Sequence, residues 1–119
     1  MPAVLPFVPS IPLYTVGTVL DGVTVFFRVR WAESPRVSRW YFDLLDENQL
    51  PIATGIKLLL GTYLARYAHH PLTEAGAFVA RDLSGGIPAR EAGFDDLGVR
   101  VVVYWFTKAE MASEITGSL

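Results

Sequence analysis

The sequence predicts an all-β fold: a small antiparallel β-barrel or sandwich of about six strands, with one short helical turn and extended termini. Three observations carry this prediction. Asp21-Gly22 lies between two β-rich runs, and Asp-Gly is a strong signal for a two-residue hairpin turn. The residues after this turn alternate in polarity with a period of two. Short apolar runs then recur along the chain, separated by clusters of turn-forming residues.

The central hairpin is expected to pair residues 11–19 with residues 23–31. A period of two places the side chains of the second strand on opposite faces of the sheet. One face is apolar and holds Val23, Val25, Phe27, Val29 and Trp31. The other face is mixed and holds Thr24, Phe26, Arg28 and Arg30. On the mixed face we expect either a buried ion pair or a contact with another subunit.

Four further strands are expected at residues 38–45, 51–58, 75–83 and 99–107. The first two form a second hairpin across a polar turn, and the second of them should turn one set of residues to one face: Ile52, Thr54, Ile56 and Leu58. Between the fourth and fifth strands, a helical turn or two is indicated by the i, i+3, i+4, i+7 spacing of Leu60, Tyr63, Leu64 and Tyr67. The sequence His69-His70-Pro71 is expected to end this helical segment.

The chain divides into an extended proline-rich arm (residues 1–10), an antiparallel β domain (11–107) and a C-terminal tail (108–119). Prolines deprive the arm of the amide donors that a central strand needs. The arm is either a disordered tail or a segment that lies on a neighbouring subunit through Val4, Leu5 and Phe7. In the second case, deleting residues 1–10 should weaken assembly without unfolding the domain. The tail forms either a short helix or a frayed end.

The last strand is almost continuously apolar from Val101 to Phe106. Such a run is either buried on both faces, or buried on one face and docked on a partner through the other. Trp105 is therefore a candidate contact residue. Long apolar strands also leave adhesive sheet edges, which closure of the sheet or contact with partners would hide.

Composition excludes several classes of protein. The chain has no cysteine, so disulfides and thiolate metal sites are absent. Its net charge is −2, which makes nucleic-acid binding unlikely. No apolar run approaches the ~20 residues of a membrane span, and the apolar N-terminus lacks the basic region of a signal peptide. Apolar residues make up 51% of the chain, which indicates either an aromatic-rich core or surface buried against partners.

Motifs for catalysis and cofactor binding are lacking, so we expect no enzyme, no cofactor and no metal. The adjacent histidines His69 and His70 diverge on a strand or a helix and cannot converge on one metal ion. No serine lies in a GxSxG elbow, and no phosphate-binding glycine motif occurs. Asp43 is unusual because it lies inside an aromatic strand, where we expect Arg28 or Arg30 to pair with it.

Three segments in order carry a resemblance to a known family: LDGVTVFFRVRW, WYFDLLDENQLPIATGIKLLLGTYL and FDDLGVRVVVYW. Together they resemble the baseplate plug proteins of contractile-tailed cyanophages, from about Val16 to Phe106. Two positions depart from the family pattern. The turn at Asn48-Gln49 lacks the expected glycine, and Tyr63 stands where a carboxylate is usual.

The resemblance implies a structural subunit of a phage tail baseplate, a plug at the tube end near hub and spike that helps to assemble and close the tail. It implies hub, tube and spike proteins as partners, an oligomeric state within the baseplate, a location in the virion and synthesis in the host cytoplasm. Candidate contact residues are Val4, Leu5, Phe7, Phe26, Arg28, Arg30 and Trp105. The alternative is a small β-barrel that binds a ligand or single-stranded nucleic acid, with Phe26, Trp40 and Tyr41 stacking on bases beside Arg28, Arg30 and Arg39.

Overall fold

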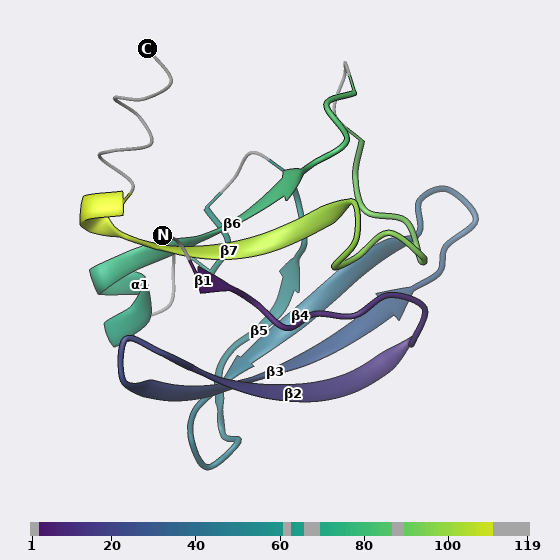
Figure 1. Cartoon of the computed structure of the whole chain (residues 1–119). Helices are drawn as coiled ribbons and strands as arrows, with labels where there is room; N and C mark the ends of the chain where they lie inside the picture. The colour runs from purple at the N-terminus through teal and green to yellow at the C-terminus, as the bar shows by residue number, and fades with distance from the viewer. Residues whose placement is uncertain (1–2, 61–62, 66–69, 87–89, 111–119) are drawn as a thin grey trace.

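The computed structural model describes residues 3–60, 63–65, 70–86 and 90–110. Its elements are β1 (Ala3–Val4), β2 (Leu13–Leu20), β3 (Val23–Ala32), β4 (Arg39–Leu45), β5 (Pro51–Lys57), α1 (Pro71–Ala75), β6 (Gly76–Asp82) and β7 (Val101–Thr107). They form two antiparallel sheets, ordered β2-β3-β4-β5 and β1-β7-β6, which lie in two layers with α1 at one end (Figure 1). The all-β prediction is confirmed. The sheets do not close on each other, so of the two predicted architectures the sandwich fits.

The hairpin β2-β3 forms as predicted around Asp21-Gly22. Both turn residues have positive φ angles, 51° for Asp21 and 76° for Gly22, as a type I′ turn requires. Leu20 and Val23 close the turn, and the register continues to Leu13 opposite Arg30. The turn chemistry and the alternation of β3 therefore specify the same register.

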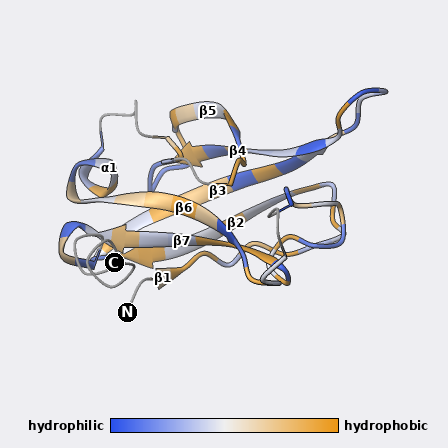
Figure 2. Ribbon diagram, turned by 90° about the horizontal axis from the view of Figure 1, so that it is seen from above, coloured by the Kyte–Doolittle hydropathy of each residue, from blue (hydrophilic) through white to orange (hydrophobic). Residues whose placement is uncertain are grey.

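The core lies between the two layers and is rich in aromatic rings. Phe27 is fully buried and meets Phe7, Phe42 and Phe78 edge-on, with ring centroids 5.3–6.0 Å apart. Edge-to-face contacts of this kind are favourable because the positive ring edge meets the negative ring face. Viewed from above, β6 and much of β7 and β3 are apolar (Figure 2). The high apolar content of the chain therefore fills a core shared by both sheets.

A bulge in β5 corrects one predicted face. Phe42 pairs with Ile56 but Leu44 pairs with Ala53, so Thr54 and Gly55 together oppose Asp43. The extra residue reverses the alternation, and Ala53, Ile56 and Leu58 are buried while Thr54 is exposed. The prediction that Thr54 shares a face with Ile56 and Leu58 is wrong for this reason.

The helix is displaced from its predicted place. Leu60 and Leu64 form β-bridges with Ala80 and Phe78, so they are not helical, and Tyr67 lies outside the described residues. The short helix α1 begins where the sequence suggested an end. His70 is its N-cap and accepts the Leu72 N–H through Nδ1, and Pro71 occupies the first helical turn, where its missing N–H costs nothing.

The N-terminal segment packs on its own domain. Ala3 and Val4 pair with β7, and the Leu5 N–H donates to the Val103 carbonyl at 2.9 Å. The side chains of Leu5 and Phe7 are only 2% and 5% exposed. Residues 5–12 then cross from the three-stranded sheet to β2 (Figure 1). The segment is neither a free tail nor an arm that needs a neighbour for its burial, and removing it is expected to destabilise the domain, contrary to the sequence-based expectation.

Tyr14 holds this segment in place through its hydroxyl group. That oxygen donates to the Val8 carbonyl at 2.9 Å and accepts the Val8 N–H at 2.8 Å. Burial raises the pKa of Tyr14 to about 12, so the hydroxyl stays protonated and keeps its donor role.

A capping box follows β7. The Thr107 hydroxyl accepts the Glu110 N–H at 3.1 Å, and the Glu110 carboxylate accepts the Thr107 N–H at 2.9 Å. This reciprocal pair is the start signal of a helix. It favours the helical alternative for the beginning of the tail, and residues 111–119 lie outside the described part of the chain.

Candidate functional site

The outward surface of the four-stranded sheet, here called the outer face, carries the mixed side chains of β3. The register of the four strands arranges them in rows across the sheet. One row is Leu13, Arg30, Tyr41 and Lys57, and the next is Thr15, Arg28 and Asp43, which lies opposite the bulge in β5. The predicted separation of Phe26, Arg28 and Arg30 from the apolar face of β3 is confirmed.

An ion pair between Arg30 and Asp43 lies at the centre of the outer face. Arg30 Nη1 is 3.1 Å from both carboxylate oxygens of Asp43. Asp43 is only 9% exposed, whereas the Arg30 side chain is 40% exposed. The sequence left Arg28 and Arg30 as alternatives, and the structure selects Arg30, the diagonal neighbour of Asp43. Arg28 lies directly opposite Asp43 but extends into solvent.

The bulge in β5 explains why a carboxylate is stable at this position. Gly55 has a φ angle of 65°, and its N–H is turned out of the ladder and donates to Asp43 Oδ1 at 2.8 Å. The carboxylate therefore accepts from both a guanidinium and a backbone amide, which satisfies its two oxygens. A Cβ at Gly55 would lie 3.9 Å from Arg30 Nη2, an ordinary contact, so it is the positive φ angle rather than lack of space that favours glycine here.

An apolar row borders the ion pair. Phe26 lies opposite Gly17 on β2 and Leu45 on β4. A Cβ added at Gly17 would stand 2.7 Å from Phe26 Cε1, so the ring lies directly over the glycine backbone. Phe26 therefore covers the outer side of β2 and remains partly exposed. Gly17 is needed here for close approach of a ring, and not for an unusual backbone angle.

The outer face is basic although the chain as a whole is acidic. Its cations are Arg28, Arg30, Arg39 and Lys57, and its carboxylate among the described strands is Asp43. The chain has a net charge of −2. Positive charge is thus concentrated on one surface, beside Tyr41, whose ring centroid is 6.0 Å from the Arg30 guanidinium carbon.

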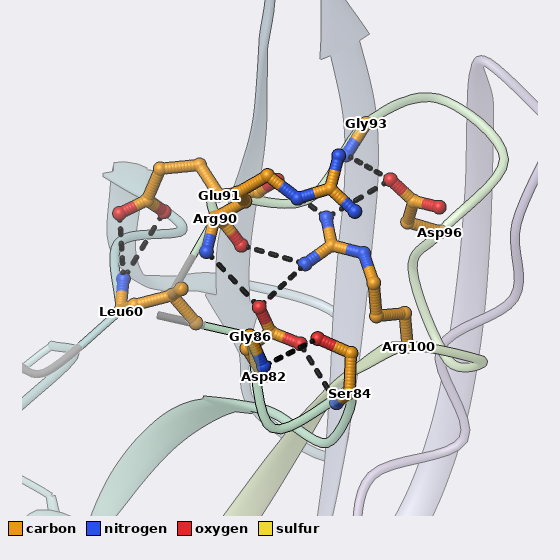
Figure 3. A network of polar contacts seen from close by, with 9 residues as sticks. All are labelled: Leu60, Asp82, Ser84, Gly86, Arg90, Glu91, Gly93, Asp96 and Arg100. Carbon is orange, nitrogen blue, oxygen red and sulfur yellow. Dashed lines mark hydrogen bonds and ion pairs between the residues drawn. The ribbon is translucent and has the colours of Figure 1, made fainter. Parts of the chain in front are cut away.

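A second polar cluster, here called the Arg100 network, fixes the loop between β6 and β7 (Figure 3). Arg100 Nη1 donates to the Arg90 carbonyl at 2.9 Å and lies 2.8 Å from Asp82. Arg100 Nη2 donates to the Glu91 carbonyl at 2.7 Å and to Asp96 at 3.0 Å. Sequence reasoning missed this cluster, because its members are far apart in the chain and each resembles an ordinary turn residue.

The carboxylates of the Arg100 network are held in their charged form. The N–H groups of Arg90 and Ser84, and then the charge of Arg100, hold the pKa of Asp82 well below its usual range. The hydrogen bond from Arg100 likewise lowers the pKa of Asp96. The Asp82 side chain is 2% exposed and the Arg100 side chain 13%. A cluster in which both Nη atoms of Arg100 are engaged by the domain's own carboxylates and carbonyls holds a loop in shape.

A shallow depression of about 300 Å³ lies beside the β2-β3 turn, between Gly22, Thr24, Glu47 and His70. Burial lowers the pKa of His70, against the opposing charges of Asp46 and Glu74, and its Nδ1 is engaged in capping α1. Within the described ranges, no three His, Cys, Asp or Glu side chains gather in a way that could hold a metal ion. His69 lies outside those ranges.

A family model described as cyanophage baseplate Pam3 plug gp18 matches residues 3–108 of the 119-residue chain. The chain belongs to this family. It is therefore a structural component of a bacteriophage tail baseplate, and the resemblance found in the sequence is confirmed. No curated protein matches the chain. None of the described helices has the length and apolar character needed to cross a membrane.

Membership in this family implies contact with other baseplate components, and the structure sorts the candidate contact residues by access. Leu5, Phe7 and Trp105 are core residues, because each is at most 5% exposed. The Trp105 indole N–H donates to the Leu72 carbonyl at 3.0 Å inside the sandwich. These residues are corrected to a structural role. The candidates with access to solvent are Val4, Phe26, Arg28 and Arg30.

The aromatic residues predicted to stack on single-stranded nucleic acid do not all lie on the surface. Trp40 is fully buried, stacks parallel to Phe94 and donates its indole N–H to the Gly93 carbonyl at 2.9 Å. It therefore cannot take part in a stacking platform on the surface. Phe26 and Tyr41 stay on the outer face, which reduces the predicted platform to two rings.

Proposed function

We propose that this chain is a plug-type subunit at the tube end of the baseplate, near hub and spike, where it helps to assemble and close the tail. Hub, tube and spike proteins are its proposed partners, in an oligomeric arrangement within the baseplate. Synthesis in the host cytoplasm precedes incorporation into the virion. The family supports the baseplate role, and the outer face supports the manner of attachment.

The proposal depends mainly on the ion pair of the outer face, in which Arg30 is held by Asp43 but remains accessible to a partner. Arg30 donates from Nη1 to Asp43, while its side chain remains 40% exposed. Arg28 and Lys57 flank it with exposed positive charge. Asp43 and Gly55 hold the Arg30 guanidinium in one place, so an acidic partner surface would meet a preorganised donor at low entropic cost. A partner carboxylate here would gain complementarity and a faster encounter.

Incorporation of charge-reversed chains into phage tests the proposal. The double variant Arg28→Glu/Lys57→Glu would be supplied from a plasmid during infection by a phage that lacks the gene. The plug content of purified tails would then be measured by mass spectrometry. We expect at least about a tenfold fall, because like charges across an interface cost several kcal/mol.

The matched control carries the same charge change away from the outer face. Arg36 lies in the β3–β4 loop and Lys108 follows β7, and both side chains are exposed. Arg36→Glu/Lys108→Glu should enter tails as the natural chain does. Normal incorporation of the outer-face variant would overturn the proposed attachment. Salt-sensitive binding of single-stranded oligonucleotides by the natural chain would favour the alternative function instead.

A further inference from the structure

The free edge of β2 is unusually open. Trp31 donates its N–H to the Pro12 carbonyl at 2.8 Å, which sets the hydrogen-bond phase between β3 and the chain leading into β2. Bonded and non-bonded pairs alternate along an antiparallel ladder. The even-numbered residues of β2 therefore bond to β3. The odd-numbered ones direct their N–H and C=O groups away from the sheet: Leu13, Thr15, Gly17 and Val19.

The other sheet edges carry features that discourage pairing with another chain. β5 begins at Pro51, is bulged at Gly55 and ends at Lys57. The edge of β6 meets Leu60 and Leu64 in β-bridges, and β1 is two residues long. Proline, bulges, lysine, short strands and covering segments are the usual protections of natural edges. Within β2, residues 13–20 contain no charge and no proline.

We infer that two copies of this chain associate by antiparallel pairing of their β2 strands about a two-fold axis at Val16. Side chains of opposed residues must lie on the same face, so odd positions pair with odd positions. Centred on Val16, Leu13 meets Val19 of the second copy, and Thr15 meets Gly17 of the second copy. These are the residues whose backbone groups point outward, so each pair can exchange both hydrogen bonds.

The same register satisfies the side chains. Leu13 is 54% exposed and Val19 is 62% exposed in the single chain, and each would cover the other across the new pair. Thr15 would lie opposite Gly17 of the second copy and would meet the ring of that copy's Phe26, which covers this glycine. Because β2 carries no charged residue, the two paired strands bring no like charges directly opposite each other. The four-stranded sheets of the two copies would become one continuous sheet with a shared outer face. The same surface of each copy would form the contact, which makes the interface isologous.

Sedimentation equilibrium of the full chain between about 1 and 200 µM tests the inference, because mass action makes the dimer fraction depend on concentration. The natural chain should approach dimer mass at the upper end. Leu13→Lys/Val19→Lys places like charges opposite each other at both ends of the register and should weaken the dimer at least about 100-fold. Leu13→Lys/Val19→Glu places opposite charges there and should restore it.

The control Leu50→Lys/Leu83→Lys adds the same charge at residues that are 60% and 54% exposed but lie outside β2. It should leave the dimer intact. Circular dichroism would establish that each variant is folded. A natural chain that stays monomeric throughout would overturn the inference. So would equal behaviour of the two β2 variants, since only antiparallel pairing of two identical strands distinguishes them. The test uses the isolated chain, so its outcome is independent of the proposed place in the baseplate.

Discussion

Arg30 and Arg100 both bind carboxylates of this domain. They differ in how many of their guanidinium donors have hydrogen-bond partners within the domain. Both Nη atoms of Arg100 are engaged, by Asp82, Asp96 and two backbone carbonyls, and the side chain is 13% exposed. Arg30 uses Nη1 on Asp43 and is 40% exposed. Among the described residues, no hydrogen bond from Arg30 Nη2 to a partner is found.

This difference indicates that Arg100 stabilises the fold, whereas Arg30 belongs to a surface that can bind a partner. The Arg100 network closes a loop with charged groups, of which the Asp82 and Arg100 side chains are largely enclosed, so its removal should mainly affect folding. The Arg30–Asp43 pair can contribute both to stability and to partner binding, because Asp43 is buried and the Arg30 side chain is partly exposed to solvent. Substitutions at the two places should therefore differ in stability and in assembly.

The largest effect is expected for Arg100→Met. Methionine keeps most of the apolar stem but leaves the Asp82 side chain, which is 2% exposed, without its cation, so the free energy of unfolding should fall more than for any other substitution compared below. Urea unfolding followed by circular dichroism measures this loss. Arg36→Met, at an exposed loop position, is the matched control and should change stability by less than about 0.5 kcal/mol. Equal midpoints would show that the Arg100 network is not a support.

Part of the stability that the Arg100 network supplies should be lost at low pH. Folding lowers the pKa values of Asp82 and Asp96, so their contribution is complete above the unfolded pKa of about 4 and is lost as pH falls below it. The urea midpoint of the natural chain should fall steeply between about pH 4 and pH 2. Arg100→Met should show a shallower fall. Parallel curves for the two proteins would contradict the assigned cause.

A smaller loss is expected for Asp43→Asn. The amide removes the ion pair with Arg30, and only its carbonyl oxygen can still accept the Gly55 N–H. The cost should be about 1.5 kcal/mol. Glu47→Gln, an exposed turn residue of the same sheet, provides the control. Unchanged stability of Asp43→Asn in urea would mean that the pair does not hold the bulge.

The smallest loss, about 1 kcal/mol, is expected for Arg30→Met, because the half-exposed cation is screened by solvent and the buried Asp43 keeps the Gly55 N–H. Its effect on incorporation into tails should be larger than its effect on stability. Arg28→Met tests the same face without the ion pair. An Arg30→Met loss as large as that of Arg100→Met would erase the distinction between the two arginines.

The candidate site was only partly visible in the sequence. Alternation placed Phe26, Arg28 and Arg30 on one face, and the isolated Asp43 indicated an ion pair. The sequence did not indicate which of the two arginines pairs with Asp43, nor the bulge that supplies the Gly55 N–H to the same carboxylate. A bulge becomes favourable only when a partner strand and a carboxylate accept the freed N–H.

The β2-β3 hairpin, the all-β class and the approximate places of six strands along the chain were predictable from the sequence alone. These follow from local chemistry: Asp21 and Gly22 accept positive φ, and an apolar period of two needs no distant partner. A polar turn was also predicted correctly, although Gln49 adopts a φ of 61°, in the left-handed region that favours glycine.

Which apolar residues are core and which are surface could not be read from the sequence, because it depends on the packing of the two sheets. Leu5, Phe7 and Trp105 were expected at a partner, yet the facing sheets bury them within one chain. The Leu60–Leu64 spacing is helical in the sequence, but bridges to β6 override it. Local patterns show that a side chain must be buried. What buries it depends on contacts between residues far apart in the chain, as with Arg100 and the carboxylates around it.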